Sequence, residues 1–321
     1  PEMGQSERDV LTRTVTLHEV TPSPTAPRRT VKEASMSSNR PDSTRFTSGR
    51  WRWALSVAVL LATPTFLSAQ LPDIQIVSDQ TGQRLQVDGE DFMVLGMNWD
   101  YFPIGTTYSY NFWGQSDDFI KAALDREMSL LQNMGVNAVR IYTGVAPKWV
   151  RYIYEEYGIF TVLNHSFGRY GVTIDGVFIE QTDYSDPATR ALIRDEVEAV
   201  VREFKDVPGV LMWLLGNENN YGLVWSSAET EALPEGERDA AKARYLYSLF
   251  GEVTDAIKTI DSTRPVAMAN GDTQYIDIIA EEAGNLDVFG ANVYRGVSFG
   301  DLFQEVKSKL GIPVMFTEFG S

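Results

Sequence analysis

Apolar positions along this chain gather into short continuous runs that alternate with stretches of helical spacing. The clearest run is Val210–Leu215, which is apolar on both faces and gives way at once to Asn217 and Glu218. A strand that is apolar on both faces is typical of a buried parallel sheet. The same pattern closes the chain at 313–318, where the run ends in Glu318. The pattern therefore predicts two buried strands, each delivering one carboxylate at its carboxyl end.

Further strands and helices are predicted in regular alternation around these two runs. The other expected strands cover residues 92–97, 137–142, 159–163, 265–269 and 286–292, and the expected helices cover 117–134, 149–157, 186–205, 237–260, 276–282 and 302–310. Gly135 has the position of a helix-ending glycine, and Asp186 followed by Pro187 is typical of a helix start. Alternating units with short connections predict a parallel α/β fold.

Seven predicted strands with polar residues beyond their ends favour a (β/α)8 barrel, or TIM barrel, over a doubly wound sheet. No Gly-x-Gly-x-x-Gly or Walker loop follows a strand, which weakens the nucleotide-binding alternative. Residues 92–321 supply no eighth strand, so the expected fold class is α/β with an incomplete barrel. An open barrel has two unpaired strand edges. The alternative to a stable incomplete barrel is therefore a chain that does not fold stably alone.

The residues before the predicted barrel fall into three parts. Residues 1–49 are rich in Ser, Thr, Pro and Arg and are expected to be disordered, in part as upstream translation before a start at Met36. Residues 50–69 join a basic flank, a short apolar run and small residues before Gln70, which is typical of a secretory signal peptide. The run is shorter than the ~20 residues of a membrane span, and an uncleaved anchor is the alternative. Residues 70–91 contain an Asp-Gly turn between alternating residues, which predicts a short β-hairpin that plugs the bottom of the barrel. The expected localisation is secreted or periplasmic.

Charge and rare residue types narrow the chemistry. The formal net charge is −16; residues 1–53 hold nine of the 28 basic and six of the 44 acidic residues, so the remainder carries −19. A nucleic-acid binder needs the opposite balance, and this acidity indicates solubility. Cysteine is absent and the only histidines are His18 and His165, which excludes thiol chemistry and disfavours a histidine-rich metal site. We therefore expect no cofactor and no metal.

Two carboxylates at one barrel mouth suit the cleavage of a glycosidic bond. Cleavage with retention needs a proton donor and a nucleophile on opposite faces of the sugar, with the carboxyl groups ~5–5.5 Å apart. Strands four and seven of an eight-stranded barrel face each other, so Glu218 and Glu318 are placed to reach that separation. Arg140, at the end of the second strand, and Tyr294, past the sixth, are placed to support one ionised carboxylate. The alternative is a pair of ordinary strand-end carboxylates.

Five stretches carry a family resemblance. They read Leu95-Gly-Met-Asn98, Met134-Gly-Val-Asn-Ala-Val-Arg140, Trp213-Leu-Leu-Gly-Asn-Glu218, Asp287-Val-Phe-Gly-Ala-Asn-Val-Tyr294 and Phe316-Thr-Glu-Phe-Gly320. In this order and each at a strand end, they resemble the retaining glycoside hydrolases of clan A, and within that clan the catalytic barrel of family 2, over residues 85–321. Family 2 enzymes usually carry β-sandwich domains before the barrel, and the clan's strand-eight residue has no counterpart here. Families 5 and 72, the latter of transglycosylases, remain alternatives.

The resemblance implies a role for each matching residue. Glu218 would be the general acid/base and Glu318 the nucleophile, while Asn217 would hydrogen-bond the sugar 2-hydroxyl. Arg140 and Tyr294 would support the nucleophile. The expected activity is a retaining glycoside hydrolase that cleaves a β-linked oligo- or polysaccharide by double displacement. A β-glucan transglycosylase of the same clan and a catalytically inactive carbohydrate-binding barrel are the alternatives. The expected partner is β-linked carbohydrate, with no nucleic acid and no stable membrane insertion.

Three more side chains are expected near the barrel mouth. The loop 98–113 is dense in aromatic residues, whose faces stack on sugars, so Trp99 is expected to contact substrate. A loop that packs its own small core is the alternative. Asp100 is expected to bind a sugar hydroxyl or to cap a turn. His165 follows the third strand together with Asn164 and is expected to point at the site, with a structural histidine as the alternative.

Overall fold

The computed structural model describes residues 71–107 and 109–320, all of them within the compact unit Pro64–Ser321. The expectations for residues 1–49 and 50–69 lie outside the described residues. Seven parallel strands form one sheet, in the order β12-β11-β10-β9-β6-β5-β4. These strands are β4 (Gly96–Asn98), β5 (Ala138–Tyr142), β6 (Phe160–His165), β9 (Val210–Leu215), β10 (Val266–Gly271), β11 (Val288–Val293) and β12 (Val314–Phe319). The sheet is an incomplete (β/α)8 barrel, as the sequence predicted.

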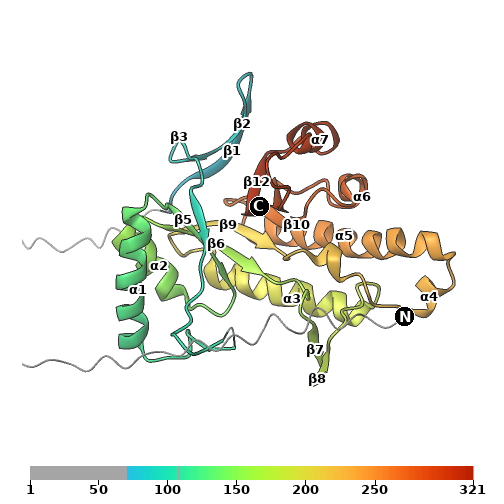
Figure 1. The fold of residues 1–321 in the computed structure, drawn as a ribbon, viewed down its shortest axis with the longest axis horizontal. Coiled ribbons are helices and arrows are strands. Elements are labelled where there is room, and N and C mark those ends of the chain that lie inside the picture. Colours follow the sequence, from blue (N-terminus) through green and yellow to red (C-terminus); the bar gives the residue numbers. More distant parts are fainter. Residues whose placement is uncertain (1–70, 108, 321) are drawn as a thin grey trace, which may run out of the picture. The chain divides into compact units, whose positions relative to one another are not determined.

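Helices cover the outer face of this sheet (Figure 1). They are α1 (Asp117–Asn133), α2 (Pro147–Tyr157), α3 (Pro187–Phe204), α5 (Glu235–Ile260), α6 (Ile276–Glu282) and α7 (Leu302–Lys309). Their starts follow local chemistry, since the side chain of Asp186 accepts a hydrogen bond from the backbone N–H of Thr189 and Pro187 occupies the first turn. The predicted helix ranges agree with these bounds to within about two residues, the usual scatter at helix ends.

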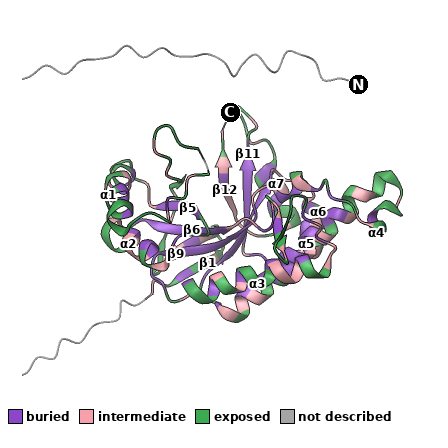
Figure 2. Cartoon of the chain, turned by 90° about the horizontal axis from the view of Figure 1, so that it is seen from below, coloured by how far each residue is buried: buried purple, intermediate pink, exposed green. Residues whose placement is uncertain are grey.

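Two apolar clusters lie on the two faces of the sheet, because successive strand residues point to opposite sides. Val139 and Ile141 of β5 pack outward against the helices, whereas Ala138 joins the cluster inside the barrel. Figure 2 shows buried residues concentrated in the central strands and on the inward faces of the helices. Arg140 is a buried charged residue inside the barrel. The residues that bind it form the site described below.

The predicted hairpin before the barrel is present and extends further than expected. β1 (Ile74–Asp79) pairs antiparallel with β2 (Gly82–Val87), and β3 (Glu90–Asp91) adds a short third strand through the Asp-Gly turn. The side chains of Ile74 and Leu85 join the apolar cluster inside the barrel. The hairpin therefore contributes to the barrel interior, as a plug would.

The first barrel strand is shorter than the predicted 92–97. The side chain of Asn137 accepts a hydrogen bond from Leu95 N and donates one to Met93 O, which satisfies this backbone without a strand ladder. Three elements were not predicted: the hairpin of β7 (Val172–Ile174) and β8 (Val177–Ile179), the short helix α4 (Ala228–Glu231), and the 3-10 turn η2 (Asn219–Gly222). Among the described residues, none of the helices has the length and apolar character to span a membrane.

Candidate active site

The turn that presents Glu218 has an unusual backbone. Gly216 has φ +78°, and Glu218 itself has φ +54°, in the left-handed region that residues with a side chain rarely adopt. A Cβ on Gly216 would lie 2.5 Å from Oδ1 of Asn219, so the close approach requires glycine. Non-glycine residues held in this region cluster at functional sites, where the surroundings compensate for the strain.

Two asparagines that follow Glu218 hold this turn in place. Oδ1 of Asn219 accepts a hydrogen bond from Asn217 N at 2.8 Å, and its amide donates to Phe167 O and to the Tyr184 hydroxyl. Asn220 exchanges two hydrogen bonds with the backbone of Gly271, at 2.8 and 3.0 Å. These bonds tie the turn to the ends of β6 and β10, so the backbone of Glu218 is fixed from both sides.

Arg140 is the centre of the polar network inside the barrel mouth. Its side chain is 6% exposed. Nε donates to Asn164 Oδ1 at 2.8 Å, and Nη1 donates to Glu318 Oε1 at 2.9 Å. Nη2 donates to Asn217 Oδ1 at 2.8 Å and to the Tyr142 hydroxyl at 3.1 Å. Burial raises the pKa of Tyr142, which therefore accepts this bond as a neutral hydroxyl. One guanidinium thus joins Glu318 to Asn217, the neighbour of Glu218.

Tyr294 completes the surroundings of Glu318. Its hydroxyl donates to Glu318 Oε2 at 2.9 Å, while Arg140 occupies the other carboxylate oxygen. The pKa of Tyr294 is raised, first by this hydrogen bond, then by burial and by the charges of Glu318 and Glu218. Because β9 and β12 are parallel strands of one sheet, Glu218 and Glu318 at their carboxyl ends lie at the same edge of the barrel. Both oxygens of Glu318 therefore have a hydrogen-bond donor.

Asn217, the residue before Glu218, is bound by the same arginine as Glu318. Its Oδ1 accepts from Arg140 at 2.8 Å and from the amide of Asn292 at 3.2 Å, and its Nδ2 donates to the Tyr170 hydroxyl at 2.8 Å. Two donors on the carbonyl side fix the amide orientation, so that Nδ2 points to Tyr170. The expected contact of Asn217 with a sugar hydroxyl stays a prediction.

His165 lies on the opposite face of β6 from Asn164. Its Nε2 is 3.4 Å from Glu196 Oε2 of α3, and its Nδ1 accepts the backbone N–H of Phe167. The two-residue period of a strand explains this, because only one of two consecutive residues faces the interior. The interior residue is Asn164, which binds Arg140. These contacts support the structural alternative for His165, and the expected contact with substrate finds no support in them.

The aromatic loop packs largely on itself. Trp99 is half-buried, with its ring centroid 5.7 Å from that of Phe112 and 6.0 Å from that of Trp113. Asp100 accepts the backbone N–H of Tyr101 at 2.8 Å, as a turn cap does. Trp99 and Asp100 also line a cavity of ≈ 140 Å³ that reaches Tyr142. The loop therefore combines its own small core with one side open toward the Arg140 network.

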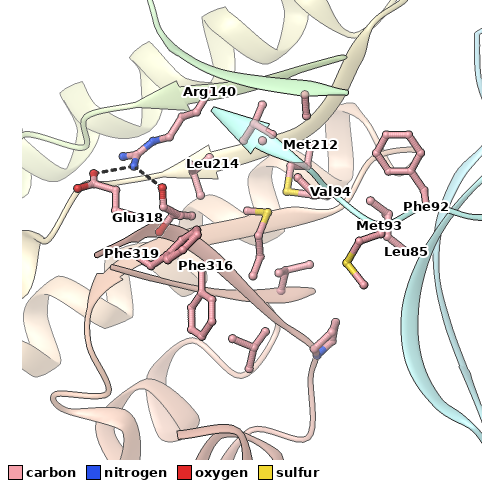
Figure 3. Close-up of a pocket in the computed structure, with 18 of the residues that line it drawn as sticks. Leu85, Phe92, Met93, Val94, Arg140, Met212, Leu214, Phe316, Glu318 and Phe319 are labelled. Atoms are coloured by element: carbon pink, nitrogen blue, oxygen red, sulfur yellow. Dashed lines mark hydrogen bonds and ion pairs between the residues drawn. The ribbon is translucent and has the colours of Figure 1, made fainter. Parts of the chain in front are cut away.

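A larger cavity of ≈ 700 Å³ runs along the inside of the barrel between β4 and β12 (Figure 3). Arg140, Glu318 and Tyr294 form its polar end, and the remaining wall is mostly apolar, with Leu85, Phe92, Met212, Leu214 and Phe316 among its lining residues. Glu218 does not line this cavity, which therefore follows the open side of the sheet rather than the line between the two carboxylates.

Several residues of the site were not singled out from the sequence. Tyr142 and Tyr170 bind Arg140 and Asn217 from a strand end and from the connection before an unpredicted hairpin. Asn292 is buried in β11, where its amide donates to Asn217 and its Oδ1 accepts a bond from Thr317. Among the described residues, no cluster of three or more metal-ligating side chains occurs.

The fold and this network define a (β/α)8 barrel with two strand-end glutamates, an asparagine before the first and an arginine on the second. The family described as "Glycosyl hydrolases family 2, TIM barrel domain" matches residues 114–321. The chain belongs to this family.

Two relatives share low sequence identity with this chain. The chain is 26% identical over 264 residues to the 1,3-beta-glucanosyltransferase gel2 of Aspergillus fumigatus, covering 76% of this chain and 49% of that protein. It is 23% identical over 266 residues to Beta-galactosidase 2 of Enterobacter cloacae, covering 74% of this chain and 22% of that protein. The chain therefore spans half or less of the length of these relatives.

Solved structures share the barrel. The β-glucuronidase 2 of Bacteroides uniformis superposes with a TM-score of 0.54 at 15% identity, covering 78% of this chain and 27% of that one. A GH2 β-galacturonidase of Eisenbergiella tayi gives a TM-score of 0.50 at 16% identity, covering 78% of this chain and 39% of that one. At this identity the likeness concerns the fold.

Proposed function

We propose that this chain carries the catalytic barrel of a retaining glycoside hydrolase that cleaves β-linked oligo- or polysaccharide by double displacement. The observation that carries the proposal is the pair of differently surrounded glutamates at one barrel mouth. Glu318 is bound on both oxygens by Arg140 and Tyr294, whereas no such cationic partner holds Glu218 among the described residues. Family membership and the relatives that act on sugars support the same reaction class.

The two steps assign a role to each side chain. In the first step the ionised Glu318 attacks the anomeric carbon, while Glu218 protonates the departing oxygen. In the second step Glu218 takes a proton from water, and the resulting hydroxide displaces Glu318 from the sugar. Arg140 and Tyr294 orient the carboxyl group of Glu318 through one hydrogen bond to each oxygen. Asn217 binds a sugar hydroxyl beside the reacting carbon through its amide, whose orientation is fixed by the bonds from Arg140 and Asn292.

Transglycosylation is the second candidate. It uses the same covalent intermediate, with a sugar hydroxyl in place of water in the second step. The observation that favours it is the similarity to a glucanosyltransferase over 76% of this chain. Adding acceptor sugars during turnover separates the two: a hydrolase releases free sugar throughout, whereas a transglycosylase forms longer products at the expense of hydrolysis.

The experiment is a screen of the purified chain against β-glycosyl fluorides and β-linked oligosaccharides, followed by proton NMR of the first product formed. Double displacement gives a first product with the β configuration of the substrate. The variants Glu218→Gln and Glu318→Gln should each lose at least a thousandfold in turnover of oligosaccharide, in the range known for catalytic groups of this kind. An α product, or wild-type activity in either variant, would contradict the mechanism.

We also propose that the protein is exported. The basic flank, apolar run and small residues of positions 50–69 motivate this, together with the proposed substrate. Sequencing the N-terminus of the protein recovered from its native host tests it. A mature chain that begins at Gln70 supports export, and a chain that retains residues 50–69 contradicts signal cleavage.

A further inference from the structure

The segment between β6 and the β7–β8 hairpin holds an arginine that the mechanism does not use. Residues 71–107 and 109–320 contain twelve arginines, and eleven of them lie within ion-pair distance of a carboxylate. Within that part of the chain, Arg169 is the exception. In a chain with a net charge of −16, a cation without a carboxylate partner stands out.

The guanidinium of Arg169 is held in a defined place. Its Cζ lies 5.8 Å from the ring centroid of Tyr170. Its Nη1 is 3.2 Å from the point where a Cβ on Gly222 would lie, so the absence of a side chain there makes room for it. Its Nε is buried and has no hydrogen-bond partner among the described residues. A guanidinium has five donors in a rigid fork, and leaving a buried donor without a partner is unfavourable.

This arginine lies on the Glu218 side of the barrel mouth. Gly222 ends the turn η2, which begins directly after Glu218, and the Tyr170 hydroxyl accepts a bond from Asn217. Glu318, in contrast, is bound by Arg140 and Tyr294 on the other side of Asn217. A proton donor stands next to the leaving group, so the side occupied by Arg169 is the leaving-group side if Glu218 is the acid.

One exposed aromatic ring adjoins the arginine, and a second covers the backbone two residues further along the chain. Tyr170 is 59% exposed and Phe178, on β8, is 63% exposed. Cζ of Phe178 lies 2.6 Å from the position of a Cβ on Gly171, so its ring covers the backbone next to Tyr170. The β7–β8 hairpin projects away from α3, below it in the view of Figure 1. Exposed rings of this kind offer apolar faces that sugars cover when they bind.

We propose that Arg169, Tyr170 and Phe178 form a leaving-group subsite for an acidic sugar residue. Arg169 binds the carboxylate of a uronic acid, and the two rings contact the apolar face of that sugar. A carboxylate matches the fork of a guanidinium with two parallel hydrogen bonds. In so acidic a chain, an anionic substrate needs a local cation to offset repulsion. The placement on the leaving-group side rests on the proposed role of Glu218.

The first test is direct binding and does not depend on turnover. Sodium glucuronate, glucose, glucose 6-sulfate and sodium acetate are titrated calorimetrically into wild type, Arg169→Gln and Arg169→Lys at low salt, after circular dichroism has confirmed folding. Wild type should bind glucuronate about tenfold or more tightly than glucose, as expected for bonds to a charged group. Arg169→Gln should remove this preference, and Arg169→Lys should keep part of it.

The outcomes of this titration separate the possible anions. Equal affinity of wild type for glucuronate and glucose, or an unchanged preference in Arg169→Gln, overturns the proposal. Acetate binding as tightly as glucuronate also overturns it, because the sugar then contributes nothing. Glucose 6-sulfate binding more tightly than glucuronate assigns the oxyanion to a sulfate ester rather than a carboxylate. The matched control is Arg194→Gln on α3, whose side chain is 46% exposed, and it should keep the wild-type preference.

The second test places the subsite relative to the cleaved bond. A β-glycosyl fluoride that the wild type turns over is offered equal concentrations of glucose and glucuronate as acceptors, and the transfer products are counted. Wild type should favour glucuronate about tenfold, Phe178→Ala should lower transfer to both acceptors by about three- to tenfold, and Arg169→Gln should lose the choice between them. If wild type transfers equally to glucose and glucuronate, the placement of the subsite on the leaving-group side is overturned. Turnover of no glycosyl fluoride overturns the proposed function while the binding result stands.

Discussion

Replacing Arg140 with alanine perturbs the network on which the proposed site depends. The side chain of Arg140 is 6% exposed and that of its partner Glu318 is 23% exposed, so this ion pair is largely buried on the arginine side and partly buried on the carboxylate side. Breaking a buried pair by removing one partner costs about 3–5 kcal/mol, because the remaining charge is left without compensation. Asn164 Oδ1 would also lose its donor, and a buried acceptor without a partner costs about 1–3 kcal/mol. Since Glu318 keeps some water and its bond to Tyr294, we take the lower end of each range and expect a loss of about 4 kcal/mol.

The assay is urea unfolding at pH 7, followed by tryptophan fluorescence, for wild type, Arg140→Ala and the surface control Arg244→Ala. Arg244 is 50% exposed and its partner Glu281 58% exposed, so the control should lose less than about 1 kcal/mol. Combining Arg140→Ala with Glu318→Gln removes the unpaired charge, and the double variant should recover about 2 kcal/mol relative to the sum of the single losses. A loss in Arg140→Ala no larger than in the control, or no coupling in the cycle, would refute the reasoning.

Three further predictions follow from single contacts. Tyr294→Phe removes one of the bonds to Glu318 and should lower kcat/KM about 10- to 100-fold, whereas activity within twofold of wild type would exclude the supporting role. Gly290→Ala places a Cβ 1.9 Å from a carbonyl oxygen of β10 and should prevent the chain from folding, as measured by fluorescence and circular dichroism. Native spectra of the variant would disprove this. Arg295→Gln removes the two hydrogen bonds that hold the pKa of Asp272 below its usual value. A lowered pKa stabilises the fold above about pH 4, and that stability is lost as the pH falls further. In urea unfolding at pH 7, Arg295→Gln should therefore be less stable than wild type by less than about 1 kcal/mol, and this difference should shrink at pH 3. A larger difference at pH 3 would contradict stabilisation by the ionised form of Asp272.

The order of strands and helices was predictable because each element repeats one simple pattern. Buried strands such as Val210–Leu215 are continuous apolar runs, and helix starts such as Asp186-Pro187 use common capping chemistry. The strand-end positions of Glu218 and Glu318 followed directly from those runs. The short first strand was not predictable from periodicity, since a side chain distant in sequence, Asn137, takes the place of the ladder.

Side-chain direction at the strand ends was only partly predictable. The expectation that Asn164 and His165 point to the same place is wrong, because consecutive strand residues face opposite sides of the sheet. Asn164 lies inside the barrel, and His165 lies against α3. The role of Tyr170 could not be derived, because it depends on how an unpredicted hairpin brings a distant hydroxyl to Asn217. Long-range polar contacts of this kind leave no periodic signal in the sequence.

The most direct test of the proposed mechanism is to trap the covalent intermediate. The chain is incubated with a 2-deoxy-2-fluoro-β-glycosyl fluoride of the sugar found in the activity screen, digested, and mapped by mass spectrometry. The fluorine at position 2 slows the breakdown of the intermediate, so the sugar should remain attached to one residue. The proposed mechanism predicts the added mass on Glu318 in wild type and none in Glu318→Gln. Attachment to Glu218 or to any other side chain, or steady turnover of the natural substrate with no label, would contradict it.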